Sequence, residues 1–529
     1  MEGDRPTRTS SRAPDGGAPS APATTTPRAG PGAIAAWLAA AALLAVMLPR
    51  VWPFTVDDAY ITLRYARNLA GGLGPTFNAT GPRAEGCTTF LWMALLAIPH
   101  AVRVDALALA KTLGVLATLG TVAVAARWAA RESGGAAWAA AAAALLLCAL
   151  PATSIHAVSG METALFTLLV TWSFAAAAAA VRDPGGGAAR ALPVPLLLAA
   201  LTRPAGLLVG GLVLAVTGAL QPAGLRGAFA RRAALAWLVP VTAFVVARAW
   251  WYGLPLPLPF YVKVAGAAPF AGWPVVREWL GTSGLRLGLF AALVLARPPR
   301  TLWPALAASA ALVLFLVRPE HVMGYQHRYL APLDPALAVV AVAGLARLGQ
   351  WLARPQASPA LARWAPLALA AAVAAVQLSD APLAVAGRRW YAEGLARAHE
   401  PLGRALRRVE PAGRLLVSDA GAIPYLSGWW TLDMVGLNDA RIATTRDRSP
   451  EALLAPDPDV VVLVSREAGR FVPFQRNPWE GPLYPAALAR GLLPLARLEF
   501  GPEYWLWVLA RPDSPAGRAL RELPAPAPR

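Results

Sequence analysis

Over its first two thirds the chain alternates long apolar runs with short polar connections. Eleven predominantly apolar runs lie at 33–48, 105–126, 136–151, 161–181, 191–202, 204–221, 233–252, 284–297, 301–317, 329–347 and 364–380. An apolar run of roughly 17 to 25 residues is long enough to cross a lipid bilayer as a helix. The pattern therefore predicts a polytopic α-helical membrane protein with about eleven transmembrane helices.

The two ends of the chain differ from this pattern. Residues 1–32 are rich in Pro, Gly, Ser, Thr and Ala and contain too little apolar surface to fold, so we expect a disordered cytoplasmic tail. Residues 512–529 are again rich in Pro, Ala and Arg, which indicates a frayed tail. The membrane domain then covers residues 33–381.

From residue 382 onward the apolar runs shorten to the length of strands. Residues 414–418, 460–464 and 504–508 are such runs, and turn residues separate them. This pattern predicts a soluble α/β domain over residues 382–511. Aromatic residues in the third run are candidates for stacking on sugar rings, although aromatic residues in strands more often belong to the core.

Composition and charge support a membrane location and set the orientation. Of the 529 residues 57% are hydrophobic and only 15% are charged, which excludes a soluble multidomain enzyme. Arginines are concentrated in the short loops that the cytoplasm would hold if the N-terminus is inside, which fits the positive-inside rule. We therefore assign the formal charge of +18 to membrane orientation rather than to nucleic acid. An odd number of spans places the α/β domain on the outer face of the plasma membrane.

Residues 50–104 form one long outer loop in this topology, with a short juxtamembrane or re-entrant helix over 88–102. On a helix that starts at Asp57, the residues Asp57, Tyr60, Arg64 and Arg67 recur at spacings of three and four and form one polar stripe. Such a helix would hold a carboxylate against the mouth of the membrane domain. The alternative for Asp58 is that it only caps the helix N-terminus.

Two motifs in this loop resemble a known family. Residues 57–69 read Asp-Asp-Ala-Tyr-Ile-Thr-Leu-Arg-Tyr-Ala-Arg-Asn-Leu, and residues 83–92 read Arg-Ala-Glu-Gly-Cys-Thr-Thr-Phe-Leu-Trp. They resemble the first outer loop of the C-type (GT-C) membrane glycosyltransferases, and among these the arabinofuranosyltransferases and related enzymes that use polyprenyl-phosphate sugars. The resemblance continues through residues 159–163, 201–206, 252–263, 327–329, 418–423 and 433–438, and so covers most of the chain. The chain departs from the family pattern at Cys87 and Ala205, which bears mainly on the donor sugar.

The resemblance implies both an activity and a base. The expected reaction moves a sugar, with arabinofuranose as one option, from a polyprenyl-phosphate donor to a glycan, lipid or protein of the cell envelope. Such a reaction needs a base for the acceptor hydroxyl, and in this family an outer-loop carboxylate has that role. The role falls on Asp57 or Asp58; we expect Asp57 to be the base and Asp58 to orient or bind substrate.

The departing phosphate requires positive charge. Lys263 and Arg328 lie near the predicted outer interface, and Arg203 lies at a turn between two apolar runs. We expect these three residues to bind the donor phosphate. The alternative is that a single basic residue at the end of a span only extends its side chain to place the charge at the membrane–water interface. The quoted motifs also contain other candidates for the pocket, namely Arg64, Glu85, Glu162, Tyr261 and His327.

Other functions remain open from the sequence alone. His156, Glu162 and Asp57 do not form a dense ligand cluster, so the sequence requires no metal or other cofactor. A transporter or flippase for lipid-linked sugars would also have many spans and basic groups at the interface. A catalytically inactive scaffold of the cell envelope is the third possibility, and it predicts that Asp57 and Asp58 can be replaced without effect.

Overall fold

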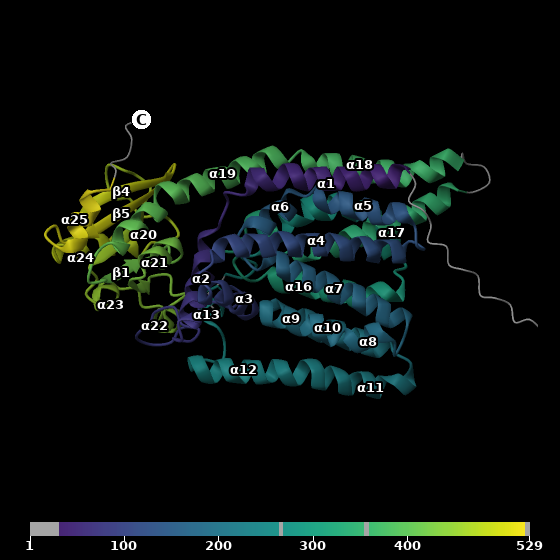
Figure 1. Ribbon diagram of the computed structural model, residues 1–529, viewed down its shortest axis with the longest axis horizontal. Coiled ribbons are helices and arrows are strands. Elements are labelled where there is room, and N and C mark those ends of the chain that lie inside the picture. Colours follow the sequence, from purple (N-terminus) through teal and green to yellow (C-terminus); the bar gives the residue numbers. More distant parts are fainter. Residues whose placement is uncertain (1–30, 264–267, 354–358, 524–529) are drawn as a thin grey trace, which may run out of the picture.

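The computed structural model describes residues 31–263, 268–353 and 359–523. A bundle of apolar helices forms one end of an elongated molecule and a smaller α/β domain forms the other (Figure 1). Of the predicted disordered tail, residues 1–30 lie outside the described residues, and Pro31 and Gly32 already belong to the first helix.

The helices of the bundle follow the predicted apolar runs. Ala137–Cys148 and Asp334–Leu352 lie at its centre, because residues on nearly every face of these helices are buried. The bundle consists of α1 (Pro31–Val51), α4 (Ala106–Glu132), α5 (Ala137–Cys148), α6 (Pro151–Val158), α7 (Thr163–Arg182), α8 (Gly187–Ala191), α9 (Pro193–Thr202), α10 (Ala205–Leu220), α11 (Ala223–Ala233), α12 (Val239–Tyr252), α13 (Leu258–Lys263), α14 (Trp273–Trp279), α15 (Leu285–Leu295), α16 (Trp303–Leu316), α17 (Asp334–Leu352), α18 (Pro359–Leu378) and α19 (Ala381–Arg397).

Fewer helices than the sequence predicts have the length and composition of a full membrane span. Among the described residues, seven helical runs are long and apolar enough to cross a membrane, or eight if the pair α5 and α6, bent by 66°, is one span. Three of the eleven predicted spans instead correspond to shorter apolar helices, at 187–202, 205–220 and 300–316. Proline residues at the ends of these helices interrupt the backbone hydrogen bonding and shorten them. Seven or eight of the eleven predicted spans thus pass on length and composition.

Residues 50–104, called the first outer loop after the side predicted for them, contain two helices, α2 (Asp57–Ala70) and α3 (Phe90–Ala101). The short α3 matches the helix predicted over 88–102. The polar stripe of α2 exists as predicted, but it faces the α/β domain instead of the membrane domain. Asp57, Tyr60, Arg64 and Arg67 all contact the segment that includes α21 (Ala422–Ser427).

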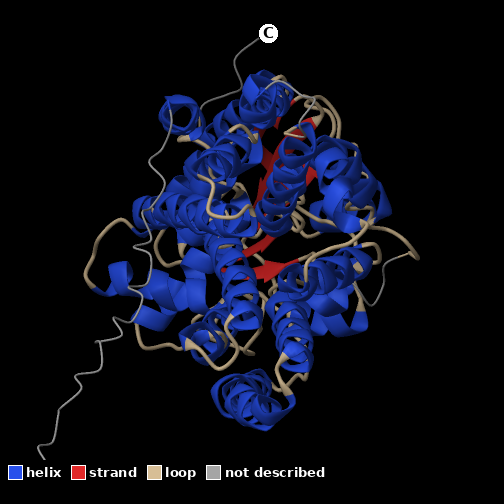
Figure 2. Ribbon diagram, turned by 90° about the vertical axis from the view of Figure 1, so that its right-hand side faces the viewer, coloured by secondary structure: helices blue, strands red, loops and turns tan. Residues whose placement is uncertain are grey.

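The α/β domain is built on one five-stranded sheet (Figure 2). The strands are β1 (Arg414–Val417), β2 (Trp430–Asp433), β3 (Val460–Ser465), β4 (Leu493–Gly501) and β5 (Tyr504–Ala510), in the order β2-β1-β3-β5-β4. β1 pairs in parallel with β2 and β3, and β5 pairs antiparallel with β3 and β4. The three predicted strand runs are thus confirmed as β1, β3 and β5.

Helices cover both faces of this sheet. Besides α21, they are α20 (His399–Arg407), α22 (Ala440–Thr445), α23 (Pro450–Leu454), α24 (Glu480–Ala489) and α25 (Pro515–Arg521). Alternate residues of β3 and β5 face a core that also contains residues of α2 and α3. The first outer loop and the α/β domain therefore share one apolar core, and Trp507 of the third predicted run lies buried in the core on the other face.

The predicted frayed tail is wrong over residues 515–521. Residues 515–521 form α25, where Ser514 caps the helix and accepts a hydrogen bond from the N–H of Gly517. Ala516 and Leu520 are buried against the sheet. Their spacing of four residues gives the helix one apolar face, which is why the segment folds despite its prolines and arginines. Residues 524–529 lie outside the described residues.

Candidate active site

The two adjacent aspartates at the start of α2 have different surroundings. Asp57 is buried, and its carboxylate accepts hydrogen bonds from the N–H groups of Gly421 (3.0 Å) and Ala422 (2.8 Å), at the N-terminal end of α21. Burial raises the pKa of Asp57 to about 6. Asp57 thus connects α2 to the α/β domain, an arrangement that argues against its expected role as base.

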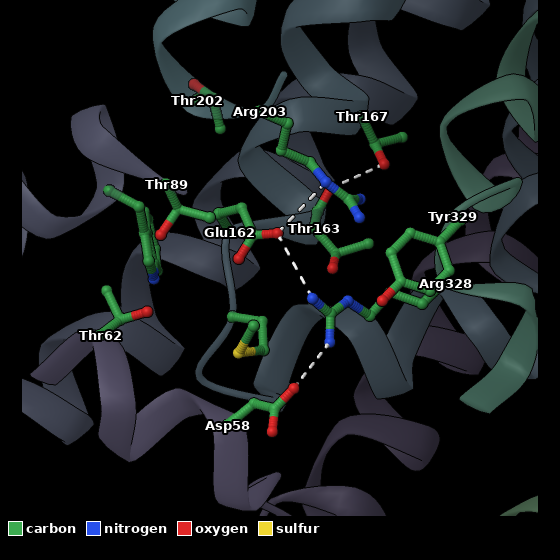
Figure 3. Close-up of polar contacts among 12 residues, drawn as sticks. Asp58, Thr62, Thr89, Glu162, Thr163, Thr167, Thr202, Arg203, Arg328 and Tyr329 are labelled. Atoms are coloured by element: carbon green, nitrogen blue, oxygen red, sulfur yellow. Dashed lines mark hydrogen bonds and ion pairs between the residues drawn. The ribbon is translucent and has the colours of Figure 1, made fainter. Parts of the chain in front are cut away.

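Asp58 points in the other direction, into a cavity of the membrane domain (Figure 3). Its Oδ2 lies 3.9 Å from Nη1 of Arg328. The residue that precedes α2 is Val56, so neither aspartate is the N-cap of this helix. Of the two carboxylates, Asp58 is therefore the one that a substrate in the cavity can reach.

This cavity has a volume of about 660 Å³ and lies between the first outer loop and helices of the bundle. Apolar residues of α12, including Phe244 and Trp250, form part of its wall. Leu437 comes from the loop after β2, so the α/β domain also reaches the cavity. The charged residues that line it are Asp58, Glu85, Glu162, Arg203, Arg248, Lys263, Glu320 and Arg328.

Two buried arginines and one buried carboxylate lie side by side in the cavity wall (Figure 3). Oε1 of Glu162 is 3.3 Å from Nε of Arg203 and 3.8 Å from Nη2 of Arg328. Neither oxygen of Glu162 has a hydrogen-bond partner, and neither do Nη1 of Arg203 and Nε and Nη1 of Arg328. Buried polar groups in proteins are nearly always hydrogen-bonded, so these free groups indicate a place for a polar ligand.

A strained turn positions Arg328. Gln326 and His327 both have positive φ, at 48° and 53°, although neither is glycine. Nε2 of His156 is 3.0 Å from the carbonyl oxygen of Gln326 and so holds the turn against α6. Non-glycine residues in this conformation persist where the surrounding structure enforces it, often at functional sites.

Tyr329 and Lys263 complete the basic wall of the cavity. The ring of Tyr329 lies 5.0 Å from the guanidinium carbon of Arg203 and 5.2 Å from that of Arg328, so it supports both. Lys263, at the end of α13, lines the cavity. The structure thus brings together all three residues predicted to bind phosphate.

An ion pair closes another side of the cavity. Glu85 accepts three hydrogen bonds from Arg248, with Nε 2.8 and 3.0 Å from the two carboxylate oxygens and Nη2 2.6 Å from Oε2. Burial raises the pKa of Glu85 in spite of this partner. The pair ties α12 to the first outer loop, and Cys87 and Ala205, the two departures from the family pattern, also line the cavity.

Three predicted pocket residues lie elsewhere. Arg64 is buried between α2 and the α/β domain, where it donates hydrogen bonds to backbone carbonyls. Tyr261 packs beside Ala84 and Leu258, and Nε2 of His327 lies 3.5 Å from Glu278. None of the three lines the cavity.

The sequence analysis missed Arg248 and Tyr329. Arg248 lies in an apolar run, where its partner Glu85, 163 residues away, gives no local signal. Tyr329 directly follows Arg328 in the quoted motif, but only the fold shows that it supports two guanidinium groups. Over residues 31–263, 268–353 and 359–523, no group of three or more His, Cys, Asp or Glu side chains is arranged to hold a metal ion.

The chain is similar to a family model and to a curated relative. A family model with the description "Domain of unknown function (DUF8728)" matches residues 388–506. The terminal β-(1→2)-arabinofuranosyltransferase of Corynebacterium glutamicum is 32% identical in an alignment of 283 residues that covers 47% of this chain. The match spans 38% of that relative's length.

The fold is shared with a solved membrane protein. The crystal structure of ArnT from Cupriavidus metallidurans bound to undecaprenyl phosphate matches with a TM-score of 0.61 at 16% identity, over 92% of this chain and 100% of that chain. Its apo state matches with a TM-score of 0.58 at 16% identity, over 92% and 98% of the two chains. The chain is therefore a polytopic helical membrane protein with the GT-C fold, as its motifs lead us to expect.

Proposed function

We propose that the protein is a membrane glycosyltransferase that moves a sugar from a polyprenyl-phosphate donor to a hydroxyl group of a cell-envelope acceptor. One observation carries this proposal. A single cavity combines the accessible carboxylate of Asp58 with two buried arginines, Arg203 and Arg328, three of whose nitrogen atoms lack a hydrogen-bond partner. A base and an anion site at this separation suit the transfer of a glycosyl group from a phosphate.

In the proposed reaction, Asp58 takes the proton of the acceptor hydroxyl. The acceptor oxygen forms a bond to the anomeric carbon as the bond from that carbon to the phosphate oxygen breaks. The electron pair of the broken bond leaves with the polyprenyl phosphate, and Arg203, Arg328 and Lys263 stabilise its charge. A single displacement of this kind inverts the configuration at the anomeric carbon.

Asp58 replaces Asp57 as the proposed base. The carboxylate of Asp57 is occupied by two N–H groups of the α/β domain, whereas Asp58 lines the cavity and lies near Arg328. Asp57 then has a structural role, because it fixes the first turn of α2 from which Asp58 projects.

The relatives support the chemical class of the substrates. One solved structure of the same fold contains undecaprenyl phosphate, and the curated relative is named as an arabinofuranosyltransferase. We therefore propose a polyprenyl monophosphate as the lipid part of the donor and a pentofuranose such as arabinofuranose as its sugar. The acceptor is a glycan, lipid or protein of the cell envelope, reached from the outer face of the plasma membrane, with the N-terminus in the cytoplasm.

The test uses the purified full chain in lipid nanodiscs, a panel of radiolabelled polyprenyl-phosphate sugars and a membrane acceptor extract. We expect the wild type to transfer sugar from one donor, with inversion at the anomeric carbon. The transfer rate of Asp58→Asn should be lower by about 10²- to 10⁴-fold, the usual contribution of a general base. Arg328→Gln should weaken donor binding. The matched control is Arg318→Gln, because Arg318 is exposed ten residues away and does not line the cavity.

Two results would contradict the proposal. Transfer that is undiminished in Asp58→Asn would remove the base assignment. No transfer from any donor by the wild type would remove the enzyme function, and a lipid-linked-sugar transporter or an inactive scaffold would then explain the cavity better.

A further inference from the structure

We propose that Glu162 drives the release of the polyprenyl phosphate that leaves after sugar transfer. The inference rests on the proposed function and adds a role for a residue that the transfer step itself does not use. Glu162 is fully buried in the wall of the cavity, beside both arginines of the proposed phosphate site.

The geometry around Glu162 is that of a carboxylate held beside its partners without bonding to them. Its distances to Arg203 and Arg328, 3.3 and 3.8 Å, are those of loose ion pairs, and both of its oxygens lack a hydrogen bond. A buried carboxylate meant only to fix two arginines would make close, charge-assisted hydrogen bonds, as Glu85 does with Arg248. The free N–H groups of the two arginines are thus left for a ligand.

Charges near the site change during the reaction. Before the reaction Arg203, Arg328 and Lys263 contribute three positive charges, and Glu162 and Asp58 contribute two negative charges. Glu85 and Arg248 neutralise each other, and the carboxylate of Glu320 is exposed and not counted. The net charge of +1 matches a donor phosphodiester, which has one negative charge. The leaving phosphomonoester has a charge of about −1.5 to −2 at pH 7.

Proton transfer to Asp58 briefly balances the extra negative charge. Once Asp58 gives that proton to water, the site again has a net charge of +1 and cannot balance the leaving phosphate. Glu162 lies beside both arginines that hold the phosphate, so its negative charge repels the phosphate and promotes its departure. Without Glu162 the two arginines and Lys263 would match the product and retain it.

The contrasting role for Glu162 is purely structural, and it predicts the opposite result. If Glu162 only holds the arginines in place, its loss disorders them and weakens the binding of every phosphate. If Glu162 repels the product, its neutral isostere binds the product more tightly. The sign of one affinity change therefore separates the two roles.

The test measures binding of undecaprenyl phosphate to the full chain in nanodiscs at pH 8 for wild type, Glu162→Gln and Glu320→Gln. Glu320 is an exposed carboxylate on the same cavity. We expect at least tenfold tighter binding in Glu162→Gln and a change of less than threefold in Glu320→Gln. In the transfer assay, Glu162→Gln should show stronger product inhibition and a lower kcat, with single-turnover transfer largely retained.

A second measurement uses only the wild type, in case Glu162→Gln does not fold. The wild type should bind the methyl phosphodiester of undecaprenol at least as tightly as undecaprenyl phosphate, despite the lower charge of the diester. A preference of more than tenfold for the monoester, or weaker product binding in Glu162→Gln, would overturn the inference alone. If the wild type binds neither lipid, both the proposed function and the inference about Glu162 are wrong.

Discussion

Replacing Arg64 with methionine should loosen the α/β domain from the first outer loop. Only 3% of the Arg64 residue is exposed. Its guanidinium donates three hydrogen bonds to backbone carbonyls, namely from Nε to Phe77 (2.6 Å), from Nη1 to Pro424 (2.6 Å) and from Nη2 to Trp429 (2.7 Å). Nη2 also donates to Oδ1 of Asn78 (2.9 Å). One side chain thus joins α2, the loop that follows it and two segments of the α/β domain.

The structure sets the size of the effect. Methionine keeps most of the apolar stem but removes the charged donor from three carbonyl oxygens, each of which keeps another donor, from Asn68, Gly428 or Thr431. A hydrogen bond to a charged group contributes about 1.5–3 kcal/mol, or about 4.5–9 kcal/mol if the three contributions add. Because neighbouring groups relax together, the lower part of that range applies. Even about 4.5 kcal/mol is a large share of the roughly 5–15 kcal/mol that stabilises a typical domain.

The assay follows thermal aggregation of the detergent-solubilised full chain by size-exclusion chromatography, together with limited proteolysis. The control is Arg67→Met, since Arg67 lies one turn along the same stripe but donates one hydrogen bond, to the carbonyl of Tyr425 (2.8 Å). We expect Arg64→Met to lower the midpoint temperature of aggregation by at least three times as much as Arg67→Met does. Arg64→Met should also expose protease cleavage sites near residues 424–431. Equal effects of the two variants would refute the idea that Arg64 holds the interface together.

Two further predictions concern the same domain. Gly421→Ala should lower both the melting midpoint and transfer activity, because its Cβ would lie 2.2 Å from the backbone oxygen of Asp57. The control is Gly469→Ala, because a Cβ at Gly469 would have no atom within 4 Å. Equal effects of the two substitutions would contradict the contact at Gly421. Burial raises the pKa of Glu480 from 4.5 to about 8 although it accepts hydrogen bonds from Ser418, Asn477 and Val464. The pKa of Glu480 is higher in the folded than in the unfolded protein. The contribution of protonated Glu480 to stability is therefore complete below pH 4.5 and is lost as pH rises through 8. The melting midpoint of the wild type should therefore decrease as pH is raised from 6.5 to 9, and that of Glu480→Gln should decrease less. Parallel plots of melting midpoint against pH for the two proteins would exclude Glu480 as the cause.

The sequence predicts the elements and the chemistry of the site better than their relative orientation. Apolar runs locate the helices, short runs locate β1, β3 and β5, and the motifs supply Asp58, Arg203, Glu162, Lys263 and Arg328 of the cavity. Hydrophobic pattern and residue type are local properties, so they can be read without the fold. The apolar runs do not fix the number of spans, because prolines divide some of them into helices shorter than 18 residues.

The direction of each face of α2 could not be predicted. The spacing correctly groups Asp57, Arg64 and Arg67 into one polar stripe, but a helix periodicity does not say which neighbour a stripe meets. That neighbour is α21, more than 350 residues later in the chain, which meets all three side chains. The adjacent stripe, with Asp58, Ile61 and Thr62, faces the cavity instead.

This division of α2 couples the α/β domain to the proposed chemistry. Asp57 and Asp58 are consecutive, so the position of α21 against the first sets the position of the second relative to Arg328. Their side chains point about 100° apart on the helix, so a rotation of α2 that relaxes one contact must disturb the other. An acceptor that binds to the α/β domain and shifts α21 would therefore move the proposed base without contacting it. The buried clamp of Arg64 restricts such a rotation, because three carbonyl oxygens from both domains hold it in place.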